Sequence, residues 1–407
     1  MDVKAIKIAD GVYWVGAIDW NIRDFHGYST PRETTYNAYL VVDERVALVD
    51  TVKSEFFEEM TSRIESVVKL EDIDYVISNH VEMDHSGSIP HIAEQTKNVK
   101  VVCTERGKSG LLKHYHGEWD FTVVKTGNTL DLGKRSLSFI EAPMLHWPDS
   151  MFTYLKEDRI LMPNDAFGQH IATSGRFDDE VPEALDEAAK YYANILMPFG
   201  SLIQAILKKL GELSVSPSII APSHGIVWHS SPGSIVEAYR RWSQGENESK
   251  VVIVYDSMWH STEKMALAIA EGAAEGKVEV KLFNLKRSDW SEIVKEILTA
   301  GVVLLGTSTL NNTMLPTLGG FLTYLSGLRP KGKVMGCFGS YGWGGGTRAV
   351  ENQVKSMGLE LMGPSLEVQY VPDKENLAKC LELGRAAASK LTGECDEVEM
   401  SNMRLHL

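Results

Sequence analysis

The chain changes its hydrophobic pattern at one polar stretch, and this change constrains the fold more than any other feature. Residues 243–249 read Ser-Gln-Gly-Glu-Asn-Glu-Ser, without apolar periodicity, directly before a strand-like run at 251–255. Downstream, further strand-like runs at 278–283, 302–306 and 333–338 alternate with helical patterns. Strict alternation of this kind predicts a doubly wound parallel sheet. We therefore expect two domains, residues 1–248 and 249–407.

The first domain is expected to be rich in β-structure. Strand-like runs at 37–42 and 46–50 flank the polar turn 43–45, which predicts an antiparallel hairpin, and a helical pattern covers 53–68. The remaining strand-like runs lie at 11–18, 75–78, 99–103, 121–125, 136–141, 152–155 and 160–162. Many strands interleaved with few helices predict a layered αββα sandwich. The fold class is thus α+β followed by α/β.

Composition places the chain among ordinary globular proteins, since 43% of its residues are hydrophobic and 24% are charged. A net charge of -14 disfavours a nucleic-acid partner, because such binding relies on Lys and Arg neutralising phosphates. The N-terminal residues lack a signal-peptide profile, and no apolar run approaches the roughly 20 residues of a membrane span. We expect a cytoplasmic protein that binds neither nucleic acid nor membrane.

The segment His-Val-Glu-Met-Asp-His at residues 80–85 places four potential metal ligands within six residues, directly after a strand-like run. If the segment is extended, alternate side chains project to one side, so His80, Glu82 and Asp84 are expected to converge. His85 would then turn toward a second ion. Four close ionisable groups are costly to bury unless a cation organises them.

Three further candidate ligands lie in similar contexts. His146, Asp165 and His224 each follow an apolar run and lie near Pro or Gly, as expected of loops at the end of a sheet. A lone histidine in such a loop is more often a packed or surface residue than a ligand. The cluster at 80–85 is therefore the main indication of a metal site.

Together, these residues resemble the metal pattern of the flavodiiron proteins, a branch of the metallo-β-lactamase superfamily. Zinc hydrolases of that superfamily carry His where this chain has Glu82, and a carboxylate there favours iron or manganese over zinc. The resemblance implies two irons and one shared ligand. It assigns His80, Glu82 and His146 to one iron, Asp84, His85 and His224 to the other, and Asp165 to both.

Other polar residues are candidates to line the same pocket. His26, His170 and Tyr192, or its neighbour Tyr191, are candidates to donate protons or hydrogen bonds to a bound oxidant. A His or an aromatic residue in such a segment is at least as often part of the packing.

Three loops of the second domain follow predicted strands at the edge where open α/β sheets bind ligands. The first leads into a helix expected near Glu263, whose free N–H groups suit a phosphate, although Ser and Thr before a helix are also ordinary N-caps. The loops comprise Ser257, Met258, Trp259, His260, Ser261 and Thr262, then Thr307, Ser308, Thr309, Leu310, Asn311 and Asn312, and finally Ser340, Tyr341, Gly342, Trp343, Gly344 and Gly345.

Residues 250–391 resemble the flavodoxin family through these loops. The resemblance implies FMN, with its phosphate on the first loop and its ring between the other two, beside Trp343 or Tyr341. The first strand-to-helix turn has no Gly-x-Gly-x-x-Gly, which disfavours a dinucleotide. The family usually has a glycine where His260 or a neighbour stands, so the sequence leaves the path of the backbone open at this point.

The two resemblances together imply an oxidoreductase in which FMN passes electrons to a di-iron site, in a head-to-tail homodimer or a dimer of dimers. The form without a Cys pair is similar to methanogen enzymes that oxidise a reduced deazaflavin coenzyme, so we expect dioxygen reduction with that donor. The alternatives are nitric oxide reduction with reduced rubredoxin, a zinc hydrolase fused to a flavodoxin module, and a non-catalytic electron carrier.

Overall fold

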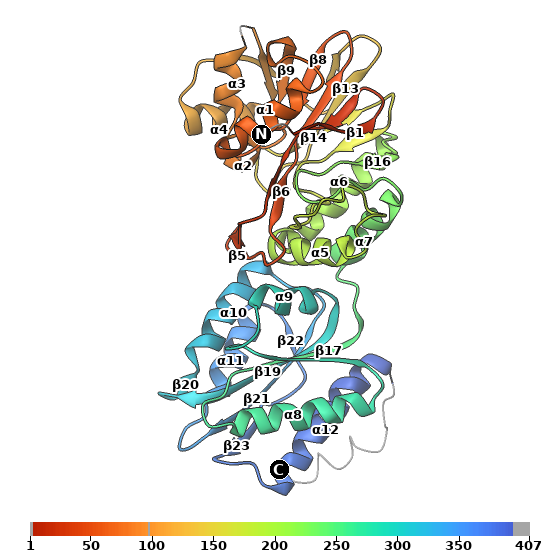
Figure 1. Cartoon of the computed structure of the whole chain (residues 1–407). Helices are drawn as coiled ribbons and strands as arrows, with labels where there is room; N and C mark the ends of the chain where they lie inside the picture. The colour runs from red at the N-terminus through yellow and green to blue at the C-terminus, as the bar shows by residue number, and fades with distance from the viewer. Residues whose placement is uncertain (1–2, 97, 394–407) are drawn as a thin grey trace. The chain divides into compact units, whose positions relative to one another are not determined.

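The computed structural model describes residues 3–96 and 98–393, so the last residues of the predicted second domain, 394–407, lie outside the described part. The chain divides into two compact units, Met1–Gln244 and Gly245–Leu407 (Figure 1). Helix α7 (Pro232–Gln244) ends the first unit, and strand β17 (Glu248–Tyr255) begins the sheet of the second. The strand takes in the last residues of the polar stretch because Glu248 pairs with Ala300.

The first unit contains two β-sheets. The first has the spatial order β1 (Ile6–Ala9), β2 (Val12–Trp14), β7 (Tyr39–Val42), β8 (Val46–Val49), β9 (Ile73–Ile77), β10 (Lys100–Cys103) and β11 (Asp120–Val123). The second has the order β12 (Thr129–Asp131), β13 (Ser136–Glu141), β14 (Met151–Leu155), β15 (Ile160–Met162) and β16 (Ile219–Ile220). The predicted hairpin is confirmed, since β7 and β8 pair antiparallel.

Side chains of the first sheet alternate between two hydrophobic cores. Tyr39 and Val41 of β7 pack in a core that includes Phe139 and Met151 of the second sheet. Leu40, between them, packs in the other core, against helices α1 (Phe57–Glu65), α3 (Ile89–Gln95) and α4 (Glu105–Tyr115). Successive side chains of a strand point to opposite faces, so one apolar run serves both cores.

Helices also flank the second sheet. Lys209 of α6 (Gly200–Glu212) donates a hydrogen bond to the Glu141 carbonyl of β13, at 3.2 Å. The unit is therefore the predicted αββα sandwich. Its shorter elements are β3 (Ala17–Asp19), β4 (Asp24–Phe25), β5 (Tyr28–Ser29), β6 (Thr34–Tyr36), α2 (Met83–Ser86), α5 (Ala184–Tyr191), a π-helix at Tyr192–Leu196, and 3-10 turns at Ser54–Phe56, Leu70–Asp72 and Met197–Phe199.

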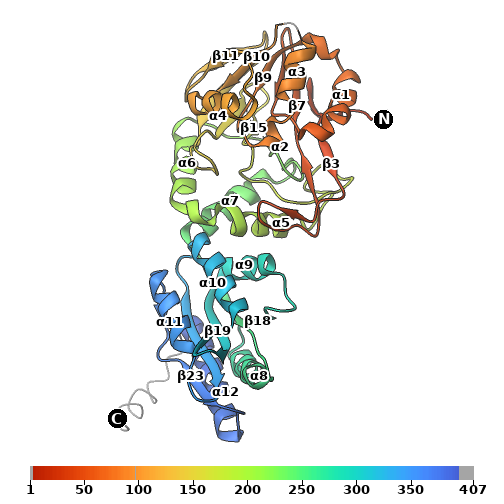
Figure 2. The ribbon, with the colours of Figure 1, turned by 90° about the vertical axis from the view of Figure 1, so that its left-hand side faces the viewer.

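The second unit is built on a parallel sheet. Its spatial order is β18 (Glu279–Asn284), β17, β19 (Ala300–Leu310) and β21 (Val334–Tyr341), and both β22 (Glu360–Leu361) and β23 (Leu366–Gln369) pair with β21. Helices α8 (Ser261–Glu275) and α12 (Lys374–Thr392) pack on one face. Helices α9 (Trp290–Thr299), α10 (Pro316–Leu328) and α11 (Thr347–Ser356) lie on the other (Figure 2). This is the predicted doubly wound fold, with β22, β23 and the short β20 (Thr313–Met314) as additions.

None of the helices in the described part of the chain combines the length and the apolar character that a membrane crossing requires.

Candidate metal centre and cofactor pocket

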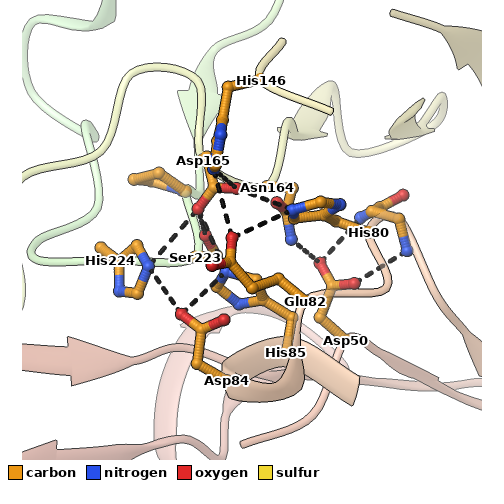
Figure 3. Close-up of polar contacts among 12 residues, drawn as sticks. Asp50, His80, Glu82, Asp84, His85, His146, Asn164, Asp165, Ser223 and His224 are labelled. Carbon is orange, nitrogen blue, oxygen red and sulfur yellow. Dashed lines mark hydrogen bonds and ion pairs between the residues drawn. The ribbon is translucent and has the colours of Figure 1, made fainter. Parts of the chain in front are cut away.

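The seven candidate metal ligands meet at one edge of the sandwich (Figure 3). His80 follows β9, Asp165 follows β15 and His224 follows β16, while His146 lies in the loop between β13 and β14. Each of these loops starts at a buried strand, so the sheets themselves carry the ligands to a common place. Among the described residues, two groups that share Asp165 hold their ligand atoms within 4.8 Å of one another: His80, Glu82, His146 and Asp165 in one, and His85, Asp165 and His224 in the other. A third group with the same spacing combines His26, Asp84 and His224.

The segment 80–85 differs from the extended loop that we expected. Glu82 has extended backbone, but it is the residue before helix α2, and Asp84 and His85 lie on that single helical turn. The helix places His85 Nε2 3.2 Å from Asp84 Oδ2. His80 Nε2 lies 3.3 Å from Glu82 Oε2. The segment is therefore split: His80 and Glu82 belong to the first group, and His85, with Asp84 beside it, lies at the second.

Asp165 lies between the groups and divides its two oxygens between them. Its Oδ2 is 3.5 Å from His146 Nε2 and 3.8 Å from His80 Nε2. Its Oδ1 is 3.1 Å from His85 Nε2 and 3.4 Å from His224 Nε2. Ligands that each lie about 2.1 Å from one ion are themselves roughly 3 to 3.5 Å apart, so both groups have the spacing of a metal site.

The centre has too many buried polar atoms for its own hydrogen bonds. Both oxygens of Asp84, Oδ2 of Asp165, and Nε2 of His146 and of His224 are buried without a hydrogen-bond partner. Each such atom costs about 1 to 3 kcal/mol when nothing satisfies it. Cations between the carboxylates and the imidazoles would satisfy all of them, so the residues present fit a two-metal site.

The same carboxylates alter the basicity of the histidines. Burial alone would lower the pKa of His146, but the adjacent carboxylates of Asp165 and Glu82 outweigh it and raise the pKa to about 9. His224, likewise buried, is raised to a pKa of about 10 by Asp165 and Asp84. A bound metal would take the place of these protons.

In the second unit, the three predicted loops enclose one cavity of about 340 Å³. Two indoles stand at its rim, because Trp343 is 90% and Trp259 85% exposed. The predicted residues that line it are Met258, Trp259, Ser261, Ser308, Thr309, Ser340, Tyr341, Gly342 and Trp343, and two that we did not predict, Tyr370 and Val371, complete it. A polar floor with aromatic walls suits a planar ligand with a polar tail.

Comparison with known proteins agrees with both sites. A family model described as ODP family beta lactamase matches residues 34–225, and a flavodoxin model matches residues 253–384. A nitric oxide reductase of Moorella thermoacetica is 53% identical over 395 residues, which cover 95% of this chain and 99% of the relative. The chain belongs to the flavodiiron family.

Solved structures of this family share the whole fold. The rubredoxin oxygen:oxidoreductase of Desulfovibrio gigas has a TM-score of 0.93 and 40% identity, covering 96% of this chain and 99% of that one. The flavodiiron protein of Giardia intestinalis has a TM-score of 0.92 and 35% identity, covering 96% and 97%. The anaerobic nitric oxide reductase flavorubredoxin of Escherichia coli is 42% identical over 94% of this chain and 82% of its own length. This flavodiiron chain is therefore an oxidoreductase.

Two of the candidates for lining the metal pocket of this flavodiiron protein are adjacent. His26 Nδ1 lies 3.2 Å from His170 Nε2, and His26 Nε2 lies 3.6 Å from Glu82 Oε1. Thr34 Oγ1 lies 2.8 Å from His170 Nδ1 and extends the row. Burial lowers the pKa of His26 to about 4, so the ring is neutral near pH 7.

The tyrosine beside this row is Tyr191. Its ring lies 4.9 Å from that of His170, whereas the Tyr192 ring packs 5.0 Å from Tyr239 and 5.2 Å from Trp242. Neighbouring residues of a helix point about 100° apart, so only one of the pair can face the pocket. The helical phase of this segment cannot be read from its sequence, so the sequence could not decide between Tyr192 and Tyr191.

Two residues that the sequence did not indicate orient the candidate ligands. Asp149 accepts hydrogen bonds from His80 Nδ1, at 3.1 Å, and from the Val81 N–H, at 2.9 Å. The Thr35 carbonyl accepts from His224 Nδ1 at 2.7 Å. Each bond turns the Nε2 atom of its histidine toward the centre. The available signal for Asp149 was its position just before a predicted strand.

The remaining residues of the three predicted loops lie outside the cavity lining. Thr262 Oγ1 is 2.9 Å from the hydroxyl oxygens of both Ser308 and Ser340, so it links the first loop to the other two. Strand β19 extends to Leu310, so Thr307 and Leu310 belong to a strand rather than a loop. Asn311 and Asn312, with φ of 49° and 59°, form the turn from β19 to β20. Ser257, Gly344 and Gly345 are likewise absent from the lining.

Two details of these loops concern the conformation and the packing of the backbone. His260 has a φ of 63°, the left-handed conformation that glycine adopts most easily, so the backbone keeps the glycine-like path despite the substitution. At Gly345, a side chain would overlap the Glu367 carboxylate. Gly345 therefore packs against a side chain of β23.

Proposed function

We propose that this flavodiiron protein reduces nitric oxide to nitrous oxide with reduced rubredoxin as the electron donor. The geometry that supports the proposal is the division of Asp165 between two groups of ligands, because two adjacent ions suit the pairing of two small molecules. The names of the relatives from Moorella and Escherichia support nitric oxide as the substrate. They favour this pairing over dioxygen and deazaflavin, our first expectation from the sequence.

A second candidate function is dioxygen reduction. It is favoured by the similarity to the rubredoxin oxygen:oxidoreductase of Desulfovibrio gigas, whose name also supports rubredoxin as donor. The same two-metal site would serve either gas.

The proposed ligand set combines the two groups that share Asp165 with Asp84, whose Oδ2 lies 3.2 Å from both His85 Nε2 and His224 Nε2. His80, Glu82 and His146 would hold one iron, Asp84, His85 and His224 the other, and Asp165 both. The bound irons supply the redox centre at which the gas is held and reduced. FMN would occupy the cavity of the second unit, with its phosphate at the start of α8, where free N–H groups favour an anion.

The chain's own residues orient this centre and supply protons. Asp149 and Thr35 fix the rings of His80 and His224, so neither has to reorganise when a ligand binds. Conversion of two NO to N2O and water consumes two protons. If His170 Nε2 donates to His26 Nδ1, the Nε2–H of His26 points toward Glu82 and is placed to deliver one.

We also propose, from the family resemblance, a head-to-tail homodimer in which the flavin of one copy serves the irons of the other. Light scattering of the purified protein measures the mass, and electron transfer between mixed copies measures the exchange. A copy lacking iron and a copy lacking FMN should restore activity when combined.

One experiment separates the candidate functions. The protein loaded with iron and FMN is given reduced rubredoxin, reduced deazaflavin coenzyme or NADH under anaerobic conditions, and the uptake of nitric oxide and of dioxygen is followed separately. We expect the fastest uptake for nitric oxide with rubredoxin, and nitrous oxide as the product. Faster dioxygen uptake would support the second candidate. Two zinc ions without iron in the purified protein would support a hydrolase.

A further inference from the structure

One buried carboxylate joins two of the segments that carry the proposed metal ligands, although it belongs to neither group of ligands. Asp50 directly follows β8 and is 3% exposed, and its φ of 56° is unusual for a residue other than glycine. Its Oδ1 accepts from the Asn79 N–H at 2.8 Å, and its Oδ2 accepts from Asn79 Nδ2 at 2.9 Å and Asn164 Nδ2 at 3.2 Å.

The two asparagines each stand immediately before a proposed ligand. Asn79 precedes His80, and Asn164 precedes Asp165 (Figure 3). Asp50 therefore connects the end of β9, in the first sheet, with the end of β15, in the second. The residue after Asp50 reaches a third segment, because the Thr51 N–H and hydroxyl both donate to the His85 carbonyl, at 2.8 and 2.7 Å.

Asn79 extends this connection across the sandwich. Its Oδ1 accepts from Thr153 Oγ1 of β14 at 2.6 Å, and its backbone carbonyl accepts from the Met151 N–H at 2.9 Å. Asn79 Nδ2 also approaches the Met162 carbonyl of β15, at 3.3 Å. The side chain is completely buried, so these bonds have no competition from water.

We propose that Asp50 is a positioning residue of the metal centre, which sets the separation between its two halves by fixing the backbone before His80 and before Asp165. The inference rests on the proposed ligand set. Only a carboxylate can play this part, because both of its oxygens must accept and no donor of its own may face the three N–H groups. An asparagine at position 50 would turn one amide donor against another, in either orientation of its side chain.

The test compares Asp50→Asn with wild type and with Asp178→Asn. Asp178 is a matched control, since its carboxylate also accepts three hydrogen bonds, from the N–H groups of residues 229, 230 and 231, each at 2.8 Å, and contacts no proposed ligand. Iron affinity is measured by equilibrium titration of the metal-free full chain with Fe(II), and FMN content by absorbance. We expect a 10- to 100-fold loss of iron affinity in Asp50→Asn only, as is typical when the support of a ligand is removed.

A second variant distinguishes a specific loss of iron affinity from an effect of unfolding. In Asp50→Asn combined with Asn164→Asp, the amide at position 50 again faces an acceptor at position 164, so part of the iron affinity should return. The spin-coupled signal of the half-reduced di-iron pair reports the separation of the ions, and we expect it to change in Asp50→Asn at full loading and to shift back in the double variant.

The proposal is overturned if Asp50→Asn binds two irons with wild-type affinity and an unchanged signal, or if Asp178→Asn loses iron equally. These readouts do not involve nitric oxide. A wild-type protein that binds two irons tightly but does not consume nitric oxide would therefore contradict the proposed substrate, and it would leave the proposed role of Asp50 unaffected.

Discussion

Asp165 decides the character of the metal centre, because each of its oxygens faces two histidines from different strand ends. A single carboxylate between two sets of imidazoles would hold two ions close together, whereas either set alone would form a mononuclear site. Its complete burial keeps water from competing for the ions.

Removing a proposed metal ligand should abolish nitric oxide uptake and leave the binding of the flavin unchanged. We expect His80→Ala and Asp165→Ala to lose iron and nitric oxide uptake, since each removes a ligand atom that no neighbour replaces, and to keep the wild-type flavin spectrum. Iron analysis and gas uptake measure the result. His229→Ala, at an exposed histidine of the same unit, is the control and should behave like wild type. Retained uptake in both ligand variants would refute the assignment.

The two neighbouring tyrosines should respond differently to substitution. The Tyr191 hydroxyl is buried without a hydrogen-bond partner beside His170, so it is available to a bound substrate. We expect Tyr191→Phe to slow nitric oxide reduction by on the order of tenfold to a hundredfold, the range of a lost proton donor. Tyr192→Phe, whose ring packs against Tyr239, should leave the rate unchanged. Steady-state rates compare the two, and equal effects would contradict this placement.

At the scale of elements, helix α2 changes the directions in which the side chains of residues 80–85 point. As an extended loop, residues 80–85 would direct three ligands to one side, but the helical turn from Met83 to Ser86 turns Asp84 and His85 toward the second group. One short helix thereby allows a single motif to supply proposed ligands to two ions.

Helices α8 and α12 approach each other closely enough to require glycine. A side chain at Gly272 would overlap the Leu381 carbonyl, and one at Gly384 would overlap the Ile269 carbonyl. We expect Gly272→Ala to lower the free energy of unfolding of the second unit by about 1 to 3 kcal/mol, because backbone cannot yield to the added methyl group. Urea unfolding, followed by the release of FMN, measures it.

Gly327 provides the matched control for that substitution. It lies in α10 of the same unit, and a methyl group added there would meet nothing within 4 Å. Gly327→Ala should be neutral or should stabilise the unit by up to about 1 kcal/mol, since alanine is the better helix former. A loss of stability equal to that of Gly272→Ala would rule out the packing explanation.

At the scale of the whole molecule, the chain keeps its two chemistries in separate units. All seven proposed metal ligands lie in the first unit, and all residues that line the flavin cavity lie in the second. Each unit has its own hydrophobic core, so the loss of one cofactor need not disturb the other site.

Removal of iron should therefore leave the flavin in place. We expect an Fe(II) chelator to lower the melting temperature of the first unit, because the buried carboxylates and imidazoles lose the cations that compensate them. The flavin content and the melting of the second unit should not change. Calorimetry together with flavin absorbance follows both, and release of FMN along with iron would contradict the independence of the sites.

A buried lysine should make the second unit more stable at alkaline pH. Lys333 is 3% exposed, and its burial, reinforced by the nearby charge of Lys250, lowers its pKa to about 7. Between that pH and the unfolded pKa of 10.5 the unfolded chain holds the proton that the folded chain has lost, so the free energy of unfolding rises with pH. Urea unfolding at pH 7 and 9.5 should show this rise, and Lys333→Met should flatten it.

The sequence by itself determined the two folds and the choice of the seven proposed metal ligands. Hydrophobic periodicity is local, and the candidate ligands stand directly beside the apolar runs that form strands, so both could be recognised without knowing the tertiary structure. The carboxylate at Glu82, where zinc enzymes have histidine, is likewise visible in a stretch of six residues.

Only the tertiary structure decided how these residues meet. The division of Asp165, the support from Asp50 and Asp149, and the contribution of Tyr370 to the flavin cavity all join residues that are far apart in the chain. The choice of Tyr191 over Tyr192 depended on the phase of one helical turn. Such relations follow from the packing of whole sheets and helices, and no local pattern of residues contains them.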